Sequence, residues 1–71
     1  MELADVRAAL KRIQMEYTEM PEMKLTVQQV RRLLDLPSDA CDVALATLVH
    51  AGFLVRSRDG AFLRAEAQLS R

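Results

Sequence analysis

The sequence has few of the residues that form disulfides, phosphate-binding loops and membrane spans. Its one cysteine, Cys41, cannot form a disulfide within the chain. Its two glycines, Gly52 and Gly60, are too few for a phosphate-binding glycine loop. No apolar run approaches the roughly 18 to 20 residues that a membrane-spanning helix needs. We therefore expect neither a disulfide-linked scaffold, nor a nucleotide-binding loop, nor a membrane protein.

Net charge is also absent. The chain carries 10 Lys and Arg residues against 10 Asp and Glu residues. Its overall field therefore does not attract a polyanion, and any basic site must be local. Residues 1–12 contain no apolar run of the signal-peptide type, and with the single cysteine this predicts an intracellular, cytoplasmic protein.

The composition that is present is that of a small globular protein. Of the 71 residues, 51% are hydrophobic and 28% are charged, which is unlike the composition of disordered chains. A chain of this size supports one small core, since it buries only about 60% of its unfolded surface. We therefore expect a single domain over residues 1–64 and a C-terminal tail over residues 65–71.

Apolar residues recur at helical spacing, beginning with a first helix at about residues 3–19. Its predicted buried face consists of Val6, Leu10, Ile13 and Tyr17. After a brief extended segment at residues 22–25, Thr26 and Gln29 have the spacing of a capping box, in which each side chain satisfies a free backbone donor. This predicts a second helix over residues 27–35. Its predicted buried stripe consists of Val27, Val30, Leu33 and Leu34.

A third helix is predicted over residues 39–51, with Ser38 as its capping residue and Gly52 as the left-handed residue that closes it. Its predicted buried face consists of Cys41, Ala44, Leu45, Leu48 and Val49. Over residues 53–64 an Asp-Gly pair separates two apolar runs, which predicts a β-hairpin. The predicted fold class is therefore α+β, mainly α.

This order of elements resembles the winged helix-turn-helix domains of bacterial transcription regulators, over about residues 6–64. The residues that carry the resemblance are Leu25, Thr26, Leu36, Pro37, Ser38, Gly52, Phe53, Leu54, Asp59 and Gly60, together with residues 45–48. The resemblance implies a three-helix domain with a C-terminal hairpin wing. It also implies that the third helix enters the major groove of DNA and that the wing touches phosphates or the minor groove. The implied state is a monomer, or a weak dimer that associates through the first helix.

The outward residues of the third helix depart from the usual pattern of that family. They are Asp39, Asp42, Val43, Ala46, Thr47 and His50. None is an Arg, Lys, Asn or Gln, the side chains that most often read guanine and adenine edges, and the two aspartates oppose phosphate. The alternative interpretation is that Asp39 and Asp42 complement the positive end of the helix dipole.

Positive charge lies beside this helix rather than on it. The candidates for phosphate contacts are Arg31 and Arg32 in the second helix and Arg56, Arg58 and Arg64 around the hairpin. An ordinary solvated surface is an equally open interpretation of these arginines. The basic residues of the first helix are expected to pair with acidic residues of the same helix.

The sequence offers no catalytic or metal-binding arrangement. His50 has no carboxylate or thiol at metal spacing, and Cys41 falls on the buried face. No nucleophile has a base and an orienting partner, so we expect no enzyme, no cofactor and no metal ion. Met15, Met20 and Met23 are expected to fill gaps in the core, although methionines also form adaptable contact surfaces.

Two functions are open on the sequence alone. The first is a small DNA-binding protein, a transcription regulator or accessory factor, that holds phosphates with its arginines while the third helix lies in the major groove. The family resemblance favours this function, and it is our prediction. The second is a protein-interaction module that does not bind DNA, in which Val43 and Ala46 contact a partner. The chemistry of the third helix favours this alternative.

Overall fold

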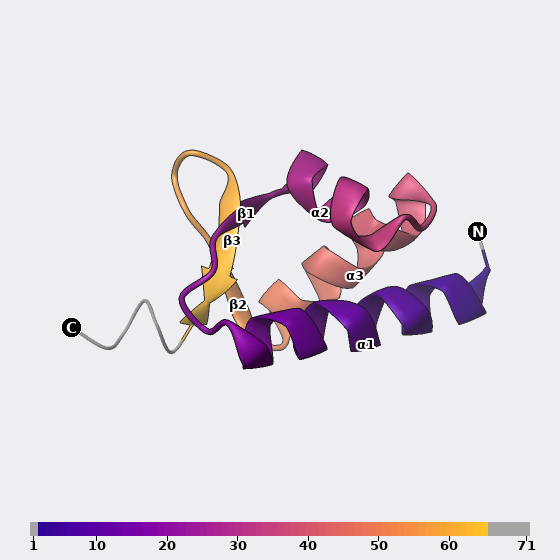
Figure 1. The fold of residues 1–71 in the computed structure, drawn as a ribbon, viewed down its shortest axis with the longest axis horizontal. Coiled ribbons are helices and arrows are strands. Elements are labelled where there is room, and N and C mark those ends of the chain that lie inside the picture. The colour runs from indigo at the N-terminus through magenta and orange to yellow at the C-terminus, as the bar shows by residue number, and fades with distance from the viewer. Residues whose placement is uncertain (1, 66–71) are drawn as a thin grey trace.

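The computed structural model describes residues 2–65, and its elements follow the predicted order (Figure 1). They are α1 (Leu3–Glu19), β1 (Leu25–Thr26), α2 (Val27–Leu34), α3 (Ser38–His50), β2 (Leu54–Arg56) and β3 (Ala61–Arg64). The mainly helical α+β class is therefore confirmed, as is the three-helix architecture with a C-terminal hairpin wing. The tail predicted over residues 65–71 lies, apart from its first residue, outside the described residues.

A small core fills the space between the three helices and the sheet. It consists of Ala9, Ile13, Tyr17, Val30, Leu34, Cys41, Ala44, Leu45, Leu48, Leu54 and Phe62. On α1 the buried face is shifted from the predicted one, because Ala9 is fully buried while Val6 and Leu10 are half-buried. On α3 the predicted face is confirmed except for Val49, which is half-buried, and Ala40 joins it with no exposed surface.

Three apolar residues that were predicted to be buried lie at the surface instead. Leu33 is 40% exposed, Met15 is 49% exposed and Met20 is 59% exposed. The short α2 has one inward face, which is formed by Val30 and Leu34, four positions apart. Leu33 lies beside that face and is therefore exposed. The prediction that methionines fill the core is therefore wrong for Met15 and Met20, whereas Met23 packs against the core.

The two helices on either side of the helix-turn-helix bend begin differently. At α2 the predicted capping box is present, since the Thr26 hydroxyl accepts from the Gln29 N–H at 3.2 Å and the Gln29 side chain accepts from the Thr26 N–H at 2.9 Å. At α3 the prediction that Ser38 caps the helix is wrong. Pro37 holds the capping position in an extended conformation (ψ 139°), which places Ser38 inside the first turn. Between the helices, Asp35 has a left-handed backbone (φ 54°).

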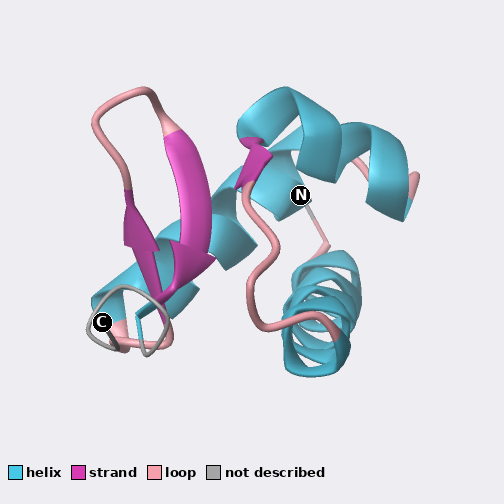
Figure 2. Cartoon of the chain, turned by 60° about the vertical axis from the view of Figure 1, so that its left-hand side comes forward, coloured by secondary structure: helices cyan, strands magenta, loops and turns pink. Residues whose placement is uncertain are grey.

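The hairpin belongs to a three-stranded antiparallel sheet of order β1-β3-β2. Leu25 of β1 lies opposite Phe62 of β3, and Val55 of β2 lies opposite Leu63. Gly60 supplies the positive φ (86°) that the turn between β2 and β3 requires. Figure 2 shows the two strands of the hairpin to one side of α1 and α2, with α3 running behind them. Of the extended segment predicted over residues 22–25, only Leu25 lies in a strand; with Thr26 it forms β1, whose pairing with β3 the sequence did not predict.

A buried hydrogen bond joins α1 to the sheet. The Tyr17 hydroxyl donates to the Phe62 carbonyl oxygen at 2.7 Å, and only 1% of Tyr17 is exposed. Burial raises the pKa of Tyr17 to about 12, although hydrogen bonding with the Leu25 backbone opposes this rise. The bond fixes the position of the hairpin relative to the helices, and thereby the position of the surface beside α3.

Candidate nucleic-acid interface

One face of α3 is exposed, and it is the face that the sequence predicted. Asp39, Asp42, Val43, Ala46, Thr47 and His50 are all exposed. The opposite face is buried against α1 and α2. The Thr47 hydroxyl donates to the Val43 carbonyl oxygen at 2.7 Å, so it is already engaged within the helix. The exposed face therefore offers small, acidic and apolar groups in place of the forked amide and guanidinium groups that read base edges.

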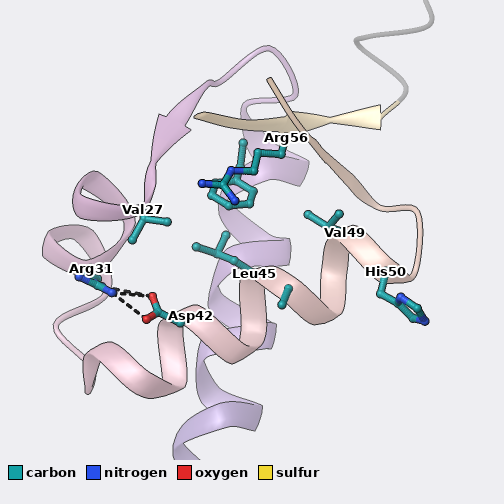
Figure 3. A pocket seen from close by; sticks show the side chains of 9 residues that line it. Val27, Arg31, Asp42, Leu45, Val49, His50 and Arg56 are labelled. Carbon is teal, nitrogen blue, oxygen red and sulfur yellow. Dashed lines mark hydrogen bonds and ion pairs between the residues drawn. The ribbon is translucent and has the colours of Figure 1, made fainter. Parts of the chain in front are cut away.

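An ion pair links α2 to the exposed face of α3. One terminal nitrogen of Arg31 lies 2.7 Å and 2.9 Å from the two carboxylate oxygens of Asp42, and Arg31 Nε lies 3.3 Å from one of them (Figure 3). Hydrogen bonding with Asp42 raises the pKa of Arg31. Because both side chains are well exposed, the pair adds little to stability. Its main effect is that each charge compensates the other.

The two aspartates of α3 therefore have different roles. Asp39 lies in the first turn, where its charge complements the helix dipole as the alternative interpretation proposed. Asp42 lies beyond the first turn, so that interpretation is wrong for it, and Arg31 is its partner. No local pattern of residues indicated this pair, because its members are 11 residues apart on different helices.

The turn of the hairpin carries a second compensated acid. Asp59 accepts a hydrogen bond from the Ser57 hydroxyl and lies 3.5 Å from Lys24 Nζ. The hydrogen bond from Ser57, and to a smaller extent the charge of Lys24, lower the pKa of Asp59. Arg58, next to Asp59 in the turn, is exposed and makes no ion pair within residues 2–65. The turn therefore carries one uncompensated positive charge.

The other candidate arginines lie in three different environments. Arg32 is exposed on α2. The Arg56 guanidinium lies 5.6 Å from the centre of the Phe62 ring, and Arg64 lies 4.5 Å from the centre of the Phe53 ring. Arg64 ends β3, at the opposite end of the hairpin from the turn. The structure thus separates Arg64 from the arginines nearer the turn and does not gather all five candidates into one cluster.

A groove of about 470 Å³ runs between α3 and the hairpin. Its apolar part consists of Val27, Leu45, Ala46, Val49 and Phe62. Arg56 lies over this part, the Arg31 and Asp42 pair lies at one end, and the ring of His50 points away from it (Figure 3). Sequence reasoning missed the groove, because its walls come from α2, α3 and the hairpin, and no short stretch of sequence contains them.

No metal site is apparent in the part of the chain that the structure describes, since residues 2–65 contain no cluster of three or more His, Cys, Asp or Glu residues suited to an ion. Cys41 is fully buried, with its sulfur 3.9 Å from the Leu36 carbonyl oxygen, and burial raises the pKa of its thiol. Among the same described residues, no helix has the length and apolar character needed to cross a bilayer.

Comparisons of the chain with family models, with curated proteins and with solved structures give no match. The charges and the shape of the surface around α3 are therefore what indicates a function.

Proposed function

We propose that the protein binds double-stranded DNA through α3 and the hairpin, with a small number of phosphate contacts. The observation that supports this proposal is that two acidic side chains on this surface are paired with cations, whereas exposed arginines beside them are not paired with acids among the described residues. Asp42 and Asp59 are each held by a cation, whereas Arg56 and Arg58 make no ion pair within residues 2–65. Of the two aspartates of α3 that argued against DNA in the sequence, Asp42 therefore opposes phosphate less than its charge alone suggests.

The remaining charges favour weak, sequence-independent binding. Arg32, Arg56 and Arg58 are exposed, and Asp39 is the acid of α3 without an ion pair within the described residues. Phosphate contacts position a protein on the duplex without reading its sequence. Since α3 carries no forked base-reading side chain, we expect the affinities for different duplexes to be similar.

The test is a fluorescence anisotropy titration of a random duplex at several salt concentrations. With three phosphate contacts, the slope of log affinity against log salt should be about −2.7, at roughly −0.9 per contact. Removal of Arg58 by Arg58→Ala should make the slope shallower by about one contact. The matched control is Arg7→Ala, which removes an exposed arginine of α1 and should leave the slope unchanged.

The ion pair gives this titration a second, opposite readout. Asp42→Ala removes a carboxylate and releases Arg31, so it should tighten binding and steepen the slope toward about −3.6, the value for four contacts. Failure of the wild-type protein to bind duplex at about 50 mM salt, where screening is weak, would overturn the proposal. Equal slopes for the wild type and Arg58→Ala would overturn the assignment of the contacts.

A second candidate function is supported by a different observation, the apolar groove between α3 and the hairpin. Phosphate groups gain nothing from an apolar surface, whereas the side chains of a protein partner do. This candidate is a protein-interaction domain, and the groove is the surface that it would use.

A further inference from the structure

The groove between α3 and the hairpin has a floor that the proposed phosphate contacts leave unused. Leu45 and Phe62 are the most buried of its lining residues, at 1% and 5% exposed, and Val27 and Val49 are half-buried. The volume of about 470 Å³ lies within the range of sites that bind other molecules, roughly 300 to 1,000 Å³. The groove is therefore large enough to take more than one side chain.

The shape of the groove fits a segment of chain rather than an enclosed small molecule. Ala46 and Arg56, which line it, are both exposed, so the groove is open to solvent along this side. A small ligand gains affinity when most of its surface is covered. An amphipathic segment needs only one covered face, which it lays along an apolar groove.

The charge of the groove indicates what that segment must carry. The Arg56 guanidinium lies over the Phe62 ring and makes no ion pair within residues 2–65. At the other end, Asp42 already has its cation in Arg31. The groove therefore presents one uncompensated positive charge among apolar side chains, where a carboxylate can form a charge-assisted, two-pronged hydrogen bond with the guanidinium.

We propose that this groove binds an amphipathic segment of a partner protein in which an Asp or Glu lies one helical turn from large apolar side chains. The carboxylate pairs with Arg56, and the apolar side chains cover Leu45 and Phe62. This inference goes beyond DNA binding. Because Arg56 is also one of the proposed phosphate contacts, the segment and the duplex compete for the protein.

Selection from a displayed library of helical peptides tests the chemistry of the partner. The library is selected on the wild-type protein and depleted on Arg56→Ala, so that peptides that ignore the arginine are removed. We expect the enriched peptides to share an acidic residue three or four positions from Leu, Ile or Phe. Enrichment without acidic residues, or no enrichment over the depleted pool, would overturn the proposal.

Titration of the ¹⁵N-labelled protein with one enriched peptide, monitored by NMR, tests where on the protein the peptide binds. Shifts should be largest in α3 and β2, and Arg56→Ala should weaken binding about ten- to a hundredfold, the loss expected for one charge-assisted hydrogen bond. Ala46→Gln, which adds neutral bulk at the open side, should weaken the peptide by a similar factor. Unchanged peptide affinity in both variants would place the peptide elsewhere and refute the site.

Two controls separate this inference from the proposed DNA binding. Arg58→Ala should weaken the duplex and leave the peptide unaffected, because Arg58 lies outside the groove. Ala46→Gln should weaken the peptide and leave the salt slope for DNA unchanged, because it alters no charge. Binding of the peptide without binding of duplex DNA would support the groove as a peptide site and refute the proposed DNA binding. Binding of duplex DNA without binding of any peptide would refute the peptide site and leave the proposed DNA binding intact.

Discussion

The two sides of α3 differ in how they meet the rest of the molecule. Toward α1 the contact is closed, and Ala44 of α3 and Ala9 of α1 have no exposed surface. Toward the hairpin the contact is open, and Ala46, only two residues from Ala44, is exposed at the edge of the groove. Alanine thus allows close packing of α3 against α1 on one side of the helix and leaves a hollow between α3 and the hairpin on the other.

This difference assigns stability and binding to opposite sides of one helix. Tightly packed interiors respond strongly to changes in side-chain volume, whereas exposed positions tolerate them. Substitutions on the α1 side of α3 should therefore change the free energy of unfolding, and substitutions on the groove side should change affinity. Four predictions, ordered by the largest loss that each one expects, test this comparison and the contacts that hold the rest of the fold.

Leu45→Ala should have the largest effect, because Leu45 is 1% exposed and belongs both to the core and to the floor of the groove. We expect a loss of about 2 to 5 kcal/mol in the free energy of unfolding, measured by urea denaturation. The control is Leu33→Ala, at a position 40% exposed, which should change stability by less than about 0.5 kcal/mol. Equal losses in the two variants would contradict the assignment of the core.

Ala44→Leu and Ala46→Leu compare the closed and open sides directly. The added side chain at Ala44 has no free space and should cost about 1 to 3 kcal/mol through overpacking. At Ala46 the same side chain enters the groove, and the change should stay within about 0.5 kcal/mol. Thermal denaturation of the pair measures both, and similar losses would show that the groove is not an open space.

Tyr17→Phe removes the hydrogen bond to the Phe62 carbonyl oxygen and leaves that oxygen without its partner. The expected cost is about 1 to 3 kcal/mol at neutral pH. In the wild type the native pKa of about 12 lies above the ordinary value of 10.0. The contribution of Tyr17 is therefore complete below pH 10, and stability should fall by roughly 1.4 kcal/mol per pH unit as the pH rises from 10 to 12.

The chain has one tyrosine, so phenolate absorbance reports this titration directly. Denaturation curves at several alkaline pH values should converge for the wild type and Tyr17→Phe as the pH approaches 12. A tyrosine that titrates near 10 in the folded protein would mean that the ring is not buried.

Thr26→Ala should have a smaller effect than Leu45→Ala, Ala44→Leu or Tyr17→Phe, since it removes only the threonine half of the capping box at α2. The expected loss is about 0.5 to 2 kcal/mol. Ser38→Ala is the matched comparison at α3, where the serine makes no capping hydrogen bond, and its stability should be close to that of the wild type. A larger loss for Ser38→Ala than for Thr26→Ala would restore the serine cap that the sequence predicted.

The fold could be predicted further than the site, for physical reasons. Helical spacing and the Asp-Gly turn are local signals, and they located three helices and the hairpin. Alanine is a weak signal on its own, so the full burial of Ala9 and Ala40, unlike that of Ala44, became visible only when the helices were packed. The sequence also could not show that Arg31 and Asp42 neutralise each other, because their contact depends on the angle between two helices.

The groove was beyond sequence reasoning for a similar reason. Its floor joins Leu45 of α3 to Phe62 of β3, and its open edge is Ala46, a residue that the sequence placed correctly on the outward face. What the sequence could not give was the space in front of that residue. A hollow depends on which element lies opposite, and the position of the hairpin follows from long-range contacts such as that between Tyr17 and Phe62.

The order of the strands has a consequence for how the molecule is made. β3 lies at the centre of the sheet and yet comes last among the strands of residues 2–65, and both outer strands pair with it. While the chain is synthesised from its N-terminus, all three helices are complete before β1 has any strand to pair with. The Tyr17 hydroxyl likewise has no Phe62 carbonyl oxygen to bind. A chain that stops before residue 61 therefore loses the whole sheet rather than one edge of it, and the groove exists only once β3 has been added.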